Sequence, residues 1–589
     1  MSNKRKYSEA ELCQILDESE EEYFSDDSSD GEYQPEHESS TESDSDCSGV
    51  SQDAEDSSLE AHGVNLLHGV SGDEVPYPAS SKKKVSSEIC WSPPKVLFIP
   101  RHTVTLHRRT ASLCNLDMSS DEMAYFLKVF PRSLIIFISQ CTNKRLDILR
   151  KKKNLVNLRE TDPGEILLVL GCMLVMSYNK VPSISDYWSH NPSLGNEAIK
   201  GAISRNRFQL LISKLYFTDP EQPASSSKTY YIDEVISCLK HTFSKARDES
   251  PYQSIDESMT KFKGRSALKQ YLPLKPIKRG IKIWERCDAM TGYAYDLNVY
   301  SGKELGQDLP ESSTLGERVV LSLTKTIRNP DVTLVFDRFF TSVHLLNSIQ
   351  YPAVGTAIST RKNMPKFQGK LKRGEFEFLA NHQRTMAARW QDSKEVTVLS
   401  NCHDATVNTA NRKQKDGRKV KVDCPELICF YNKYMGGVDL SDQKVGVYDF
   451  DRRSNKWWKK VFYKVLMLAV VNSWILYMDT TKKDVRLLQF IVPLAEKMMA
   501  MGKEQSKVKR KRCRGRPSKI AKLMLNVGDH LPVEGNTRRR VDFNYGNKEK
   551  SNGSTSGEYG GCGITEVLVL EKNCHDQRVS RRVVVVERT

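Results

Sequence analysis

The sequence predicts a mixed α/β protein in which a sheet carrying acidic residues is flanked by helical segments. Three observations support this fold class. From 118 to 251, apolar residues recur at three- and four-residue spacing, as in amphipathic helices. From 252 to 360, short apolar runs alternate with helical stretches, and two of these runs lead into aspartates. From 425 to 500 the helical pattern returns.

Charge is unevenly distributed along the 589 residues. Residues 1–80 contain 22 Asp and Glu and three basic residues, a net charge of −19. Because the whole chain carries +15, the remainder carries +34. So basic a body favours a polyanionic partner, nucleic acid ahead of a membrane surface. It also argues against a hydrolase that acts on an uncharged substrate.

Residues 1–117 are expected to form an acidic, disordered N-terminal region. The run Ser25–Asp30 illustrates its composition, which is too poor in apolar side chains to offset the entropy lost on ordering. No signal peptide is expected, because Met1–Lys6 leads into acidic residues. The 14 cysteines include no Cys-x-x-Cys pair, which indicates reduced thiols in an intracellular protein.

Residues 118–251 are predicted to form a helical domain, which is either purely structural or has basic faces that hold DNA. Ser183 followed by Asp186 predicts a capped helix start. The apolar stretches 165–176 and 461–478 are expected to be buried core helices and not membrane spans. The first is too short, and Lys464 and Asn472 interrupt the second. Other helices are expected over residues 121–130, 131–140, 206–215 and 231–245.

Residues 252–360 are predicted to form the first part of a sheet-containing core. An apolar strand is expected to end near Asp256, and a second, 332–336, leads directly into Asp337. Two alternating runs around a Gly-containing turn, 280–284 and 293–300, predict a β-hairpin. If both aspartates lie at the carboxyl ends of neighbouring strands, the sheet brings them together.

The rest of the chain is divided by its composition. Residues 361–424 are basic and β-prone, which predicts an inserted subdomain. Residues 425–449 would complete the core and place Asp439 on a helix, and 450–500 would complete the helical domain. Residues 501–540 form a basic linker, and the tail, 541–589, shows no coherent domain.

Asp256, Asp337 and Asp439 are the candidates for chemistry. Three clustered carboxylates would repel one another unless cations lay among them, and ligation by oxygen alone selects Mg²⁺ or Mn²⁺. Two such ions can activate an attacking oxygen and stabilise a leaving oxygen in a phosphoryl displacement. Spacing alone favours the ordinary alternative, three solvated aspartates, because aspartate is a common residue.

Several motifs change that balance, because together they closely resemble the signatures of piggyBac transposases. They occur in the family's order between about 120 and 500. They are the segments Ser254–Glu257, Leu268–Pro276, Phe336–Ser342, Tyr431–Asn432 and Gly436–Gln443.

The resemblance implies an RNase H-like catalytic core with a three-aspartate (DDD) metal site. Asp256, Asp337 and Asp439 match the family's triad. Asp256 would bridge two metal ions, and the other two would anchor one each. Asp442 matches a fourth acid with a supporting role. The implied activity is DNA transposition, with cleavage at transposon ends and joining at TTAA targets by a homodimer.

The resemblance also implies where DNA binds. The two helical segments would form a dimerisation and DNA-binding domain, and Trp457 falls where an aromatic residue near DNA is expected. Packing between helices is an equal alternative for this tryptophan. Basic residues around the site, Lys263, Arg265 and Lys275, would hold the phosphodiester.

The C-terminal part departs from the family, whose members usually end in a zinc-binding domain. Only Cys562, Cys574 and His575 are available near the end, so no zinc site is expected. Arg514 and Arg516 resemble an AT-hook core, which can enter a narrow minor groove. A nuclear-localisation run is the favoured alternative, and a nuclear protein is expected in both cases. Two functions remain open: a transposase, or a domesticated, non-catalytic DNA- or chromatin-binding protein.

Overall fold

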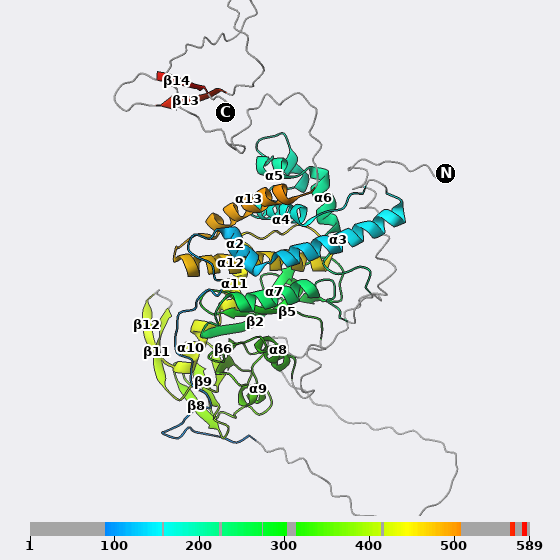
Figure 1. Ribbon diagram of the computed structural model, residues 1–589. Helices are drawn as coiled ribbons and strands as arrows, with labels where there is room; N and C mark the ends of the chain where they lie inside the picture. The colour runs from blue at the N-terminus through cyan, green and yellow to red at the C-terminus, as the bar shows by residue number, and fades with distance from the viewer. Residues whose placement is uncertain are drawn as a thin grey trace, which may run out of the picture. The chain divides into compact units, whose positions relative to one another are not determined.

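The structure, a computed structural model, consists of two units, residues 1–509 and 510–589. In the first unit, helices lie against one end of a large mixed sheet (Figure 1). Residues 1–88, which include most of the predicted disordered region, lie outside the described part of the chain. The structure describes residues 89–507, with gaps at 156–157, 223–226, 274, 303–313 and 414–417. It also describes two strands near the C-terminus.

The helices expected in the first helical segment are present, and side chains cap several of them. Asp121 and Asp162 each accept a hydrogen bond from a backbone N–H in the first turn of the following helix. Ser183 and Asp186 form the predicted capping box, although the turn that follows is 3₁₀. The elements are α2 (Glu122–Val129), α3 (Arg132–Lys153), α4 (Pro163–Tyr178), η1 (Ile184–Trp188), α5 (Glu197–Ala202), α6 (Arg205–Lys214) and α7 (Asp233–Ala246).

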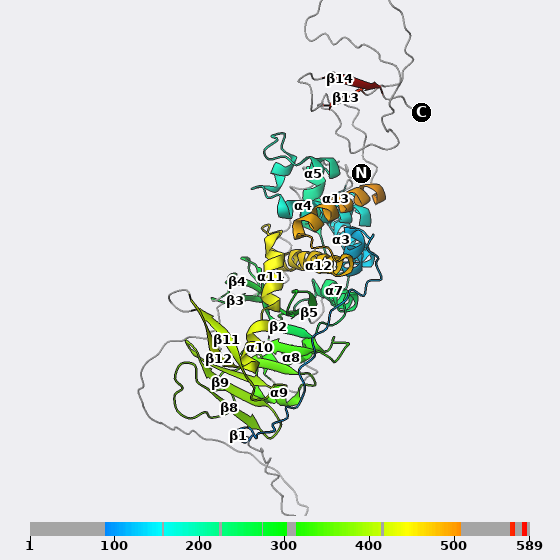
Figure 2. The same ribbon diagram turned by 90° about the vertical axis from the view of Figure 1, so that its left-hand side faces the viewer.

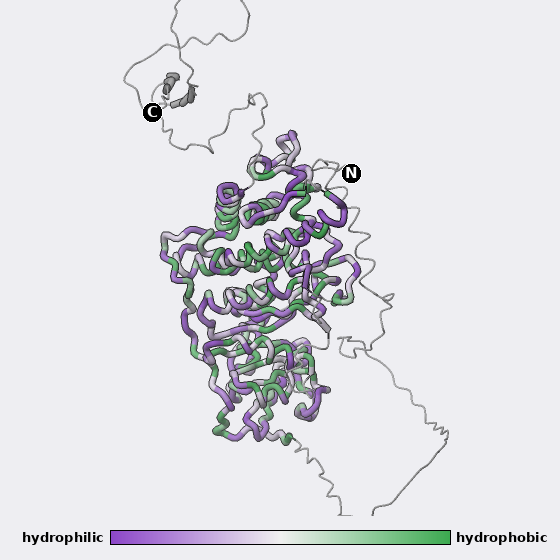
Figure 3. Tube along the Cα trace, turned by 45° about the vertical axis from the view of Figure 1, so that its right-hand side comes forward, coloured by the Kyte–Doolittle hydropathy of each residue, from purple (hydrophilic) through white to green (hydrophobic). Residues whose placement is uncertain are grey.

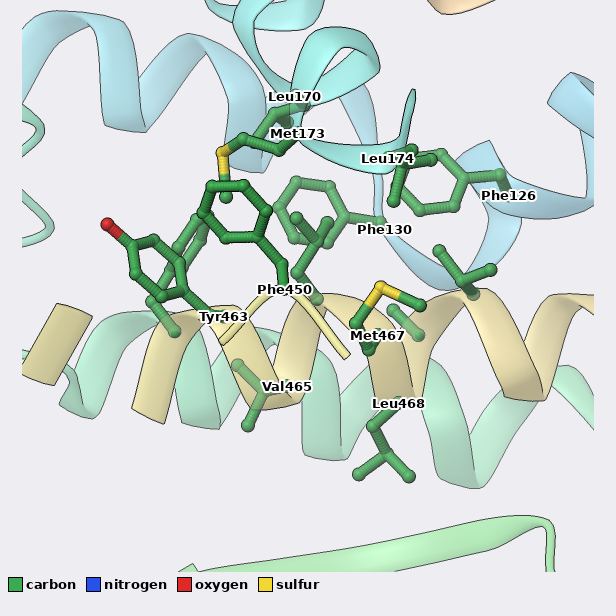
Figure 4. Close-up of a cluster of buried hydrophobic side chains, with 14 of the residues drawn as sticks. Phe126, Phe130, Leu170, Met173, Leu174, Phe450, Tyr463, Val465, Met467 and Leu468 are labelled. Carbon is green, nitrogen blue, oxygen red and sulfur yellow. The ribbon is translucent and has the colours of Figure 1, made fainter. Parts of the chain in front are cut away.

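Two later helices, α12 (Trp457–Thr481) and α13 (Leu487–Gln505), pack with this first set. Figure 4 shows side chains of α2, α4 and α12 meeting in the shared core. By length and composition α12 could cross a membrane, but 83% of its most apolar stretch is buried inside the protein, as in a core helix. Figure 3 shows hydrophobic residues gathering along the inner helices and strands of this unit.

A ten-stranded sheet forms the other half of the unit, in the order β1-β8-β9-β10-β7-β6-β2-β4-β3, with β5 paired to β4. β6 runs parallel to β2 and β7, and the other pairs are antiparallel. β4 and β5 are the predicted hairpin. The strands are β1 (Trp91–Ser92), β2 (Tyr252–Lys261), β3 (Lys269–Tyr271), β4 (Arg279–Asp288), β5 (Ala294–Val299), β6 (Thr333–Phe336), β7 (Ala353–Thr356), β8 (Phe376–Asn381), β9 (Met386–Gln391) and β10 (Glu395–Ser400).

The β-rich insertion predicted over 361–424 is not a separate subdomain throughout. Its first three strands extend the core sheet, because β10 pairs with β7 and so covers the open edge of that strand. Only β11 (Val407–Lys413) and β12 (Lys419–Pro425) form a ribbon of their own. Both views show this ribbon beside β8 and β9 (Figures 1 and 2).

The predicted disorder extends too far, because residues 89–117 are bound to the core. Trp91 pairs with Asn381 of the edge strand β8. The Thr105 N–H donates to Thr333 Oγ1 (3.0 Å), and the Leu113 N–H donates to the Ala246 carbonyl (2.8 Å). The segment is ordered because groups of β6, α7 and β8 pair with its backbone.

Helices cover both faces of the central strands. On one face, α8 (Leu315–Thr324) and α9 (Val343–Ser348) pack against Ile255 and Phe336. On the other face, α10 (Glu426–Tyr434) packs against Val335 and Val354, and α11 (Gly437–Val447) follows it along β2. Figure 2 shows α11 between α12 and the sheet.

In the second unit, β13 (Glu566–Glu571) and β14 (Ser580–Val585) form an antiparallel pair. The basic run containing Arg514 and Arg516 lies outside the described residues, and so do Cys562, Cys574 and His575.

Protonation of His403 should make the first unit, residues 1–509, less stable in mild acid. Its ring accepts or donates a 2.8 Å hydrogen bond with Ser400, and burial lowers the pKa of His403 to about 4. The unfolded chain, with a histidine pKa near ~6.5, therefore binds more protons between these values. Stability is full above pH 6.5, and about 2 kcal/mol is lost by pH 5.

Urea unfolding of wild type and His403→Gln at pH 7 and pH 5 measures this loss. The variant should lose about 2 kcal/mol less than wild type on acidification. The exposed His382 offers a control, and His382→Gln should behave like wild type. An unchanged pH dependence in His403→Gln would contradict the assignment.

Candidate active site

Asp256 and Asp337 lie next to each other on the face of the sheet that α10 and α11 cover. The last pair of the parallel β2–β6 ladder is Ile255 with Phe336, so the two aspartates follow it side by side. Asp256 lies in the middle of β2 and not at its end, contrary to the sequence prediction. The strand continues because β4 still pairs with it after β6 has ended.

The electrostatics of this pair reflect burial and like charge. Asp256 is 8% exposed. Burial, and then the neighbouring carboxylates of Glu257 and Asp337, raise the pKa of Asp256. Burial and Glu257 likewise raise the pKa of Asp337. Desolvation and mutual repulsion both disfavour the charged forms, so a proton or a cation at this pair is favoured.

Lys275 supplies the nearest positive charge. Its ammonium lies 3.7 Å from Asp256 Oδ2 and 3.5 Å from Glu257 Oε1. Burial acts to lower the pKa of Lys275, but the carboxylates of Asp256, Glu257 and Asp439 raise it overall. This one side chain therefore interacts with carboxylates from both β2 and α11.

Asp439 lies in the first turn of α11, which runs along β2. The Val438 N–H donates to Ser254 Oγ (3.1 Å), and Ser258 Oγ donates to Asp442 Oδ1 (2.7 Å). The two serines flank Asp256 on the same face of the strand, since side chains alternate along it. The contacts on both sides of Asp439 therefore direct this part of α11 past Asp256.

A hollow of about 550 Å³ opens beside Asp439. Lys275, Asp442 and Lys464 also line it, so the third aspartate is reached from solvent.

A polar cluster connects α11 to α12, β2 and β4. Lys464, from α12, donates to Asp442 Oδ1 (2.6 Å) and to Ser258 Oγ, and its ammonium lies 3.8 Å from Glu285 Oε1. Glu285 is the cross-strand partner of Asp256 and has no solvent exposure. Burial raises the pKa of Glu285 to about 7, although Lys464 opposes the shift. Asp442 is thus paired with a lysine.

Sequence reasoning missed Glu257, Glu285 and Lys464. In the sequence, Lys464 stands out only as an interruption of an apolar helix. That interruption was a usable signal, because a lysine in a buried helix is almost always paired. Nothing in the local sequence distinguishes Glu257 or Glu285 from a surface acid.

The donor set fits a divalent cation in its chemistry. The side chains around the pair offer oxygen ligands, the carboxylates and the hydroxyls of Ser254 and Ser258, and the mutually repelling carboxylates already hold one ammonium. Across the described ranges, however, no three Asp, Glu, His or Cys side chains are arranged as ready ligands.

The remaining predicted residues lie apart. Lys263 and Arg265 are exposed on the turn after β2. Trp457 is only 8% exposed and belongs to the helical core, which supports the packing alternative.

Comparison with known proteins defines the class. A family profile described as Transposase IS4 matches residues 121–474, more than half of the chain and all three aspartates. The chain belongs to this family of transposases. Within the family it is of the piggyBac type, as its relatives show.

Two curated human relatives illustrate this. The chain is 28% identical over 342 residues to PiggyBac transposable element-derived protein 3 (Homo sapiens), covering 56% of this chain and 57% of that protein. It is 27% identical over 379 residues to PiggyBac transposable element-derived protein 2 (Homo sapiens), covering 61% and 62%. The chain thus spans about three fifths of the length of these relatives.

A solved structure shares the fold. A cryo-EM structure of a piggyBac transposase synaptic complex with hairpin DNA aligns with a TM-score of 0.59 and 24% identity, covering 67% of this chain and 84% of that one. The mixed α/β architecture expected from the sequence is therefore confirmed at the level of the fold.

Loss of the Lys464 charge should destabilise the protein strongly. Lys464→Met leaves Asp442 and Glu285 without their cation, which should cost about 3–5 kcal/mol in the free energy of unfolding. Lys497→Met is the matched control, because Lys497 pairs with Glu122 (2.6 Å) with 40% of its side chain exposed. That change should cost less than about 1 kcal/mol.

Urea denaturation of both variants measures the difference. Adding Asp442→Asn and Glu285→Gln to Lys464→Met should recover most of the loss, because no buried charge then lacks a partner. Equal losses in Lys464→Met and Lys497→Met would contradict the role of the buried cluster.

Proposed function

We propose that this protein cleaves and joins DNA strands as a transposase of the piggyBac type, with an RNase H-like core. The observation that carries the proposal is the register that sets Asp256 beside Asp337, with Asp439 on the helix that passes them. The basic charge of the body, +34 outside the first 80 residues, suits a DNA substrate.

Asp256, Asp337 and Asp439 would hold Mg²⁺ or Mn²⁺. When bound, such ions activate an attacking water or 3′-hydroxyl and stabilise the leaving oxygen of the phosphodiester.

The chain's other residues act around these ligands. Asp442 supports the site through its pairing with Lys464, which fixes α11 on β2. Lys275 balances the carboxylates of Asp256 and Glu257, and its ammonium would also attract the phosphate of the substrate. Lys263 and Arg265, exposed on the adjacent turn, hold the DNA backbone.

The family supplies the finer expectations. We propose that the substrates are transposon ends and TTAA targets, that the active form is a homodimer, and that the protein acts in the nucleus. The basic run from Lys507 to Lys519 supports nuclear import.

Metal-dependent nicking should depend on the aspartate pair. With Mg²⁺ and a duplex carrying TTAA, Asp256→Asn and Asp337→Asn should each reduce cleavage by at least about 100-fold, because each removes a carboxylate expected to hold metal. Asp484→Asn is the control, since Asp484 is exposed and lies outside the segments that contain the three aspartates. Gel analysis of end-labelled DNA measures the products. Cleavage that persists unchanged in Asp256→Asn would overturn the assignment.

A second function is favoured by one observation, the net charge of +34 outside the first 80 residues, which suits DNA binding whether or not the site cleaves DNA. In that case the protein would be a domesticated, non-catalytic DNA- or chromatin-binding protein. DNA binding without nicking by wild type in either Mg²⁺ or Mn²⁺ would select this alternative.

A further inference from the structure

A second hollow, of about 740 Å³, adjoins the hollow beside Asp439, and its lining is basic. None of the described residues that line it is acidic. Aromatic and cationic side chains together suit a nucleic-acid strand, which offers phosphates and flat bases. These side chains are Lys261, Lys263, Lys269, Lys278, Arg279 and Tyr271.

Two of the lysines are available to a ligand. Lys261 pairs with Asp451 (2.7 Å), and Lys269 donates to the Gly264 carbonyl (3.0 Å). Lys263 and Lys278 are exposed, and no carboxylate in the described part of the chain pairs with either. Two ammonium groups without acidic partners, in a concave wall, form an anion site.

Tyr271 offers a stacking surface in the same hollow. It is 59% exposed although it lies in the short strand β3. Its cross-strand partner is Arg279, whose guanidinium lies 5.1 Å from the centre of the tyrosine ring. This contact holds the ring in a fixed orientation while much of its surface stays open to solvent.

The basic hollow is continuous with the hollow beside Asp439. Lys261, Pro276 and Ile277 line both. The loop between β3 and β4 carries Pro276 and Ile277, and it also carries Lys275, whose ammonium lies 3.7 Å from Asp256 Oδ2. A strand with one phosphate at the carboxylates can therefore continue directly into the basic hollow.

We propose that the basic hollow binds an unpaired stretch of DNA strand, with phosphates on Lys263 and Lys278 and one base stacked on Tyr271. The strand must be unpaired, because bases inside a duplex are stacked on each other and cannot reach a side chain. The site's place next to the scissile phosphate rests on the proposed function, but the binding itself does not.

The test measures binding without cleavage, in EDTA. The probe is a duplex with a short single-stranded tail that carries 2-aminopurine, and the reference is the same duplex fully paired. Wild type should prefer the tailed duplex and quench the 2-aminopurine fluorescence. Tyr271→Ala should lose the quenching and about tenfold in affinity for the tailed duplex, with its affinity for the paired duplex unchanged. Tyr271→Phe should retain both properties.

The lysines have a separate readout. Lys263→Ala with Lys278→Ala should lower the slope of log affinity against log salt by about 1.4 for the tailed duplex, as expected for two lost phosphate contacts to a single strand. Lys366→Ala with Lys370→Ala is the control, because these exposed lysines line neither hollow. This control pair should leave the tail preference and the quenching as in wild type.

Two results would overturn the proposal. One is that Tyr271→Ala quenches the 2-aminopurine fluorescence as strongly as wild type does. The other is that Tyr271→Ala loses as much affinity for the paired duplex as for the tailed duplex. Failure of the proposed function is separate from both, since it would show as intact tail binding without nicking after Mg²⁺ is added.

Discussion

The packing of α11 on β2 is the contact on which the site depends. At Gly437 the helix comes so close to the strand that an added Cβ would lie 2.4 Å from Ser254 Oγ. Only glycine allows this approach, which lets the Val438 N–H reach the same hydroxyl. Further along the helix, Lys464 joins Asp442, Ser258 and Glu285 in one buried cluster. These two contacts fix the position of Asp439 relative to Asp256, although more than 180 residues separate them in sequence.

The arrangement concentrates negative charge where water is scarce. Asp256 is buried and Asp337 is half-buried beside it, Glu257 adds a further carboxylate, and Lys275 pairs with Asp256 and Glu257. Such a group is stable only if the surroundings offset it. Lys275 does so directly, and the basic side chains of the neighbouring hollow suit the phosphates of a substrate. The acidic cluster and the basic hollow therefore lie on the same surface, along the loop between β3 and β4.

Most of the helices and several strands could be predicted from the sequence, because the spacing of apolar residues and short motifs are local signals. The apolar periodicity predicted the helices and the hairpin, and the strand 332–336 was expected to lead into Asp337. The position of Asp256 within its strand was wrong, because strand length depends on β4, a partner that no local pattern reveals. The same is true of β10, whose pairing with β7 joins the insertion to the core. Lys464 and Glu285 were missed because a buried ion pair depends on three-dimensional proximity alone.

The central claim is that Asp256, Asp337 and Asp439 together hold divalent cations. Backbone cleavage by hydroxyl radicals generated at bound Fe²⁺ tests it most directly, because the radicals cut the chain only near the ion. The account predicts cuts near all three aspartates, suppressed by excess Mg²⁺ and lost in Asp256→Asn. Cuts confined to other segments, or a pattern that Mg²⁺ does not suppress, would contradict it.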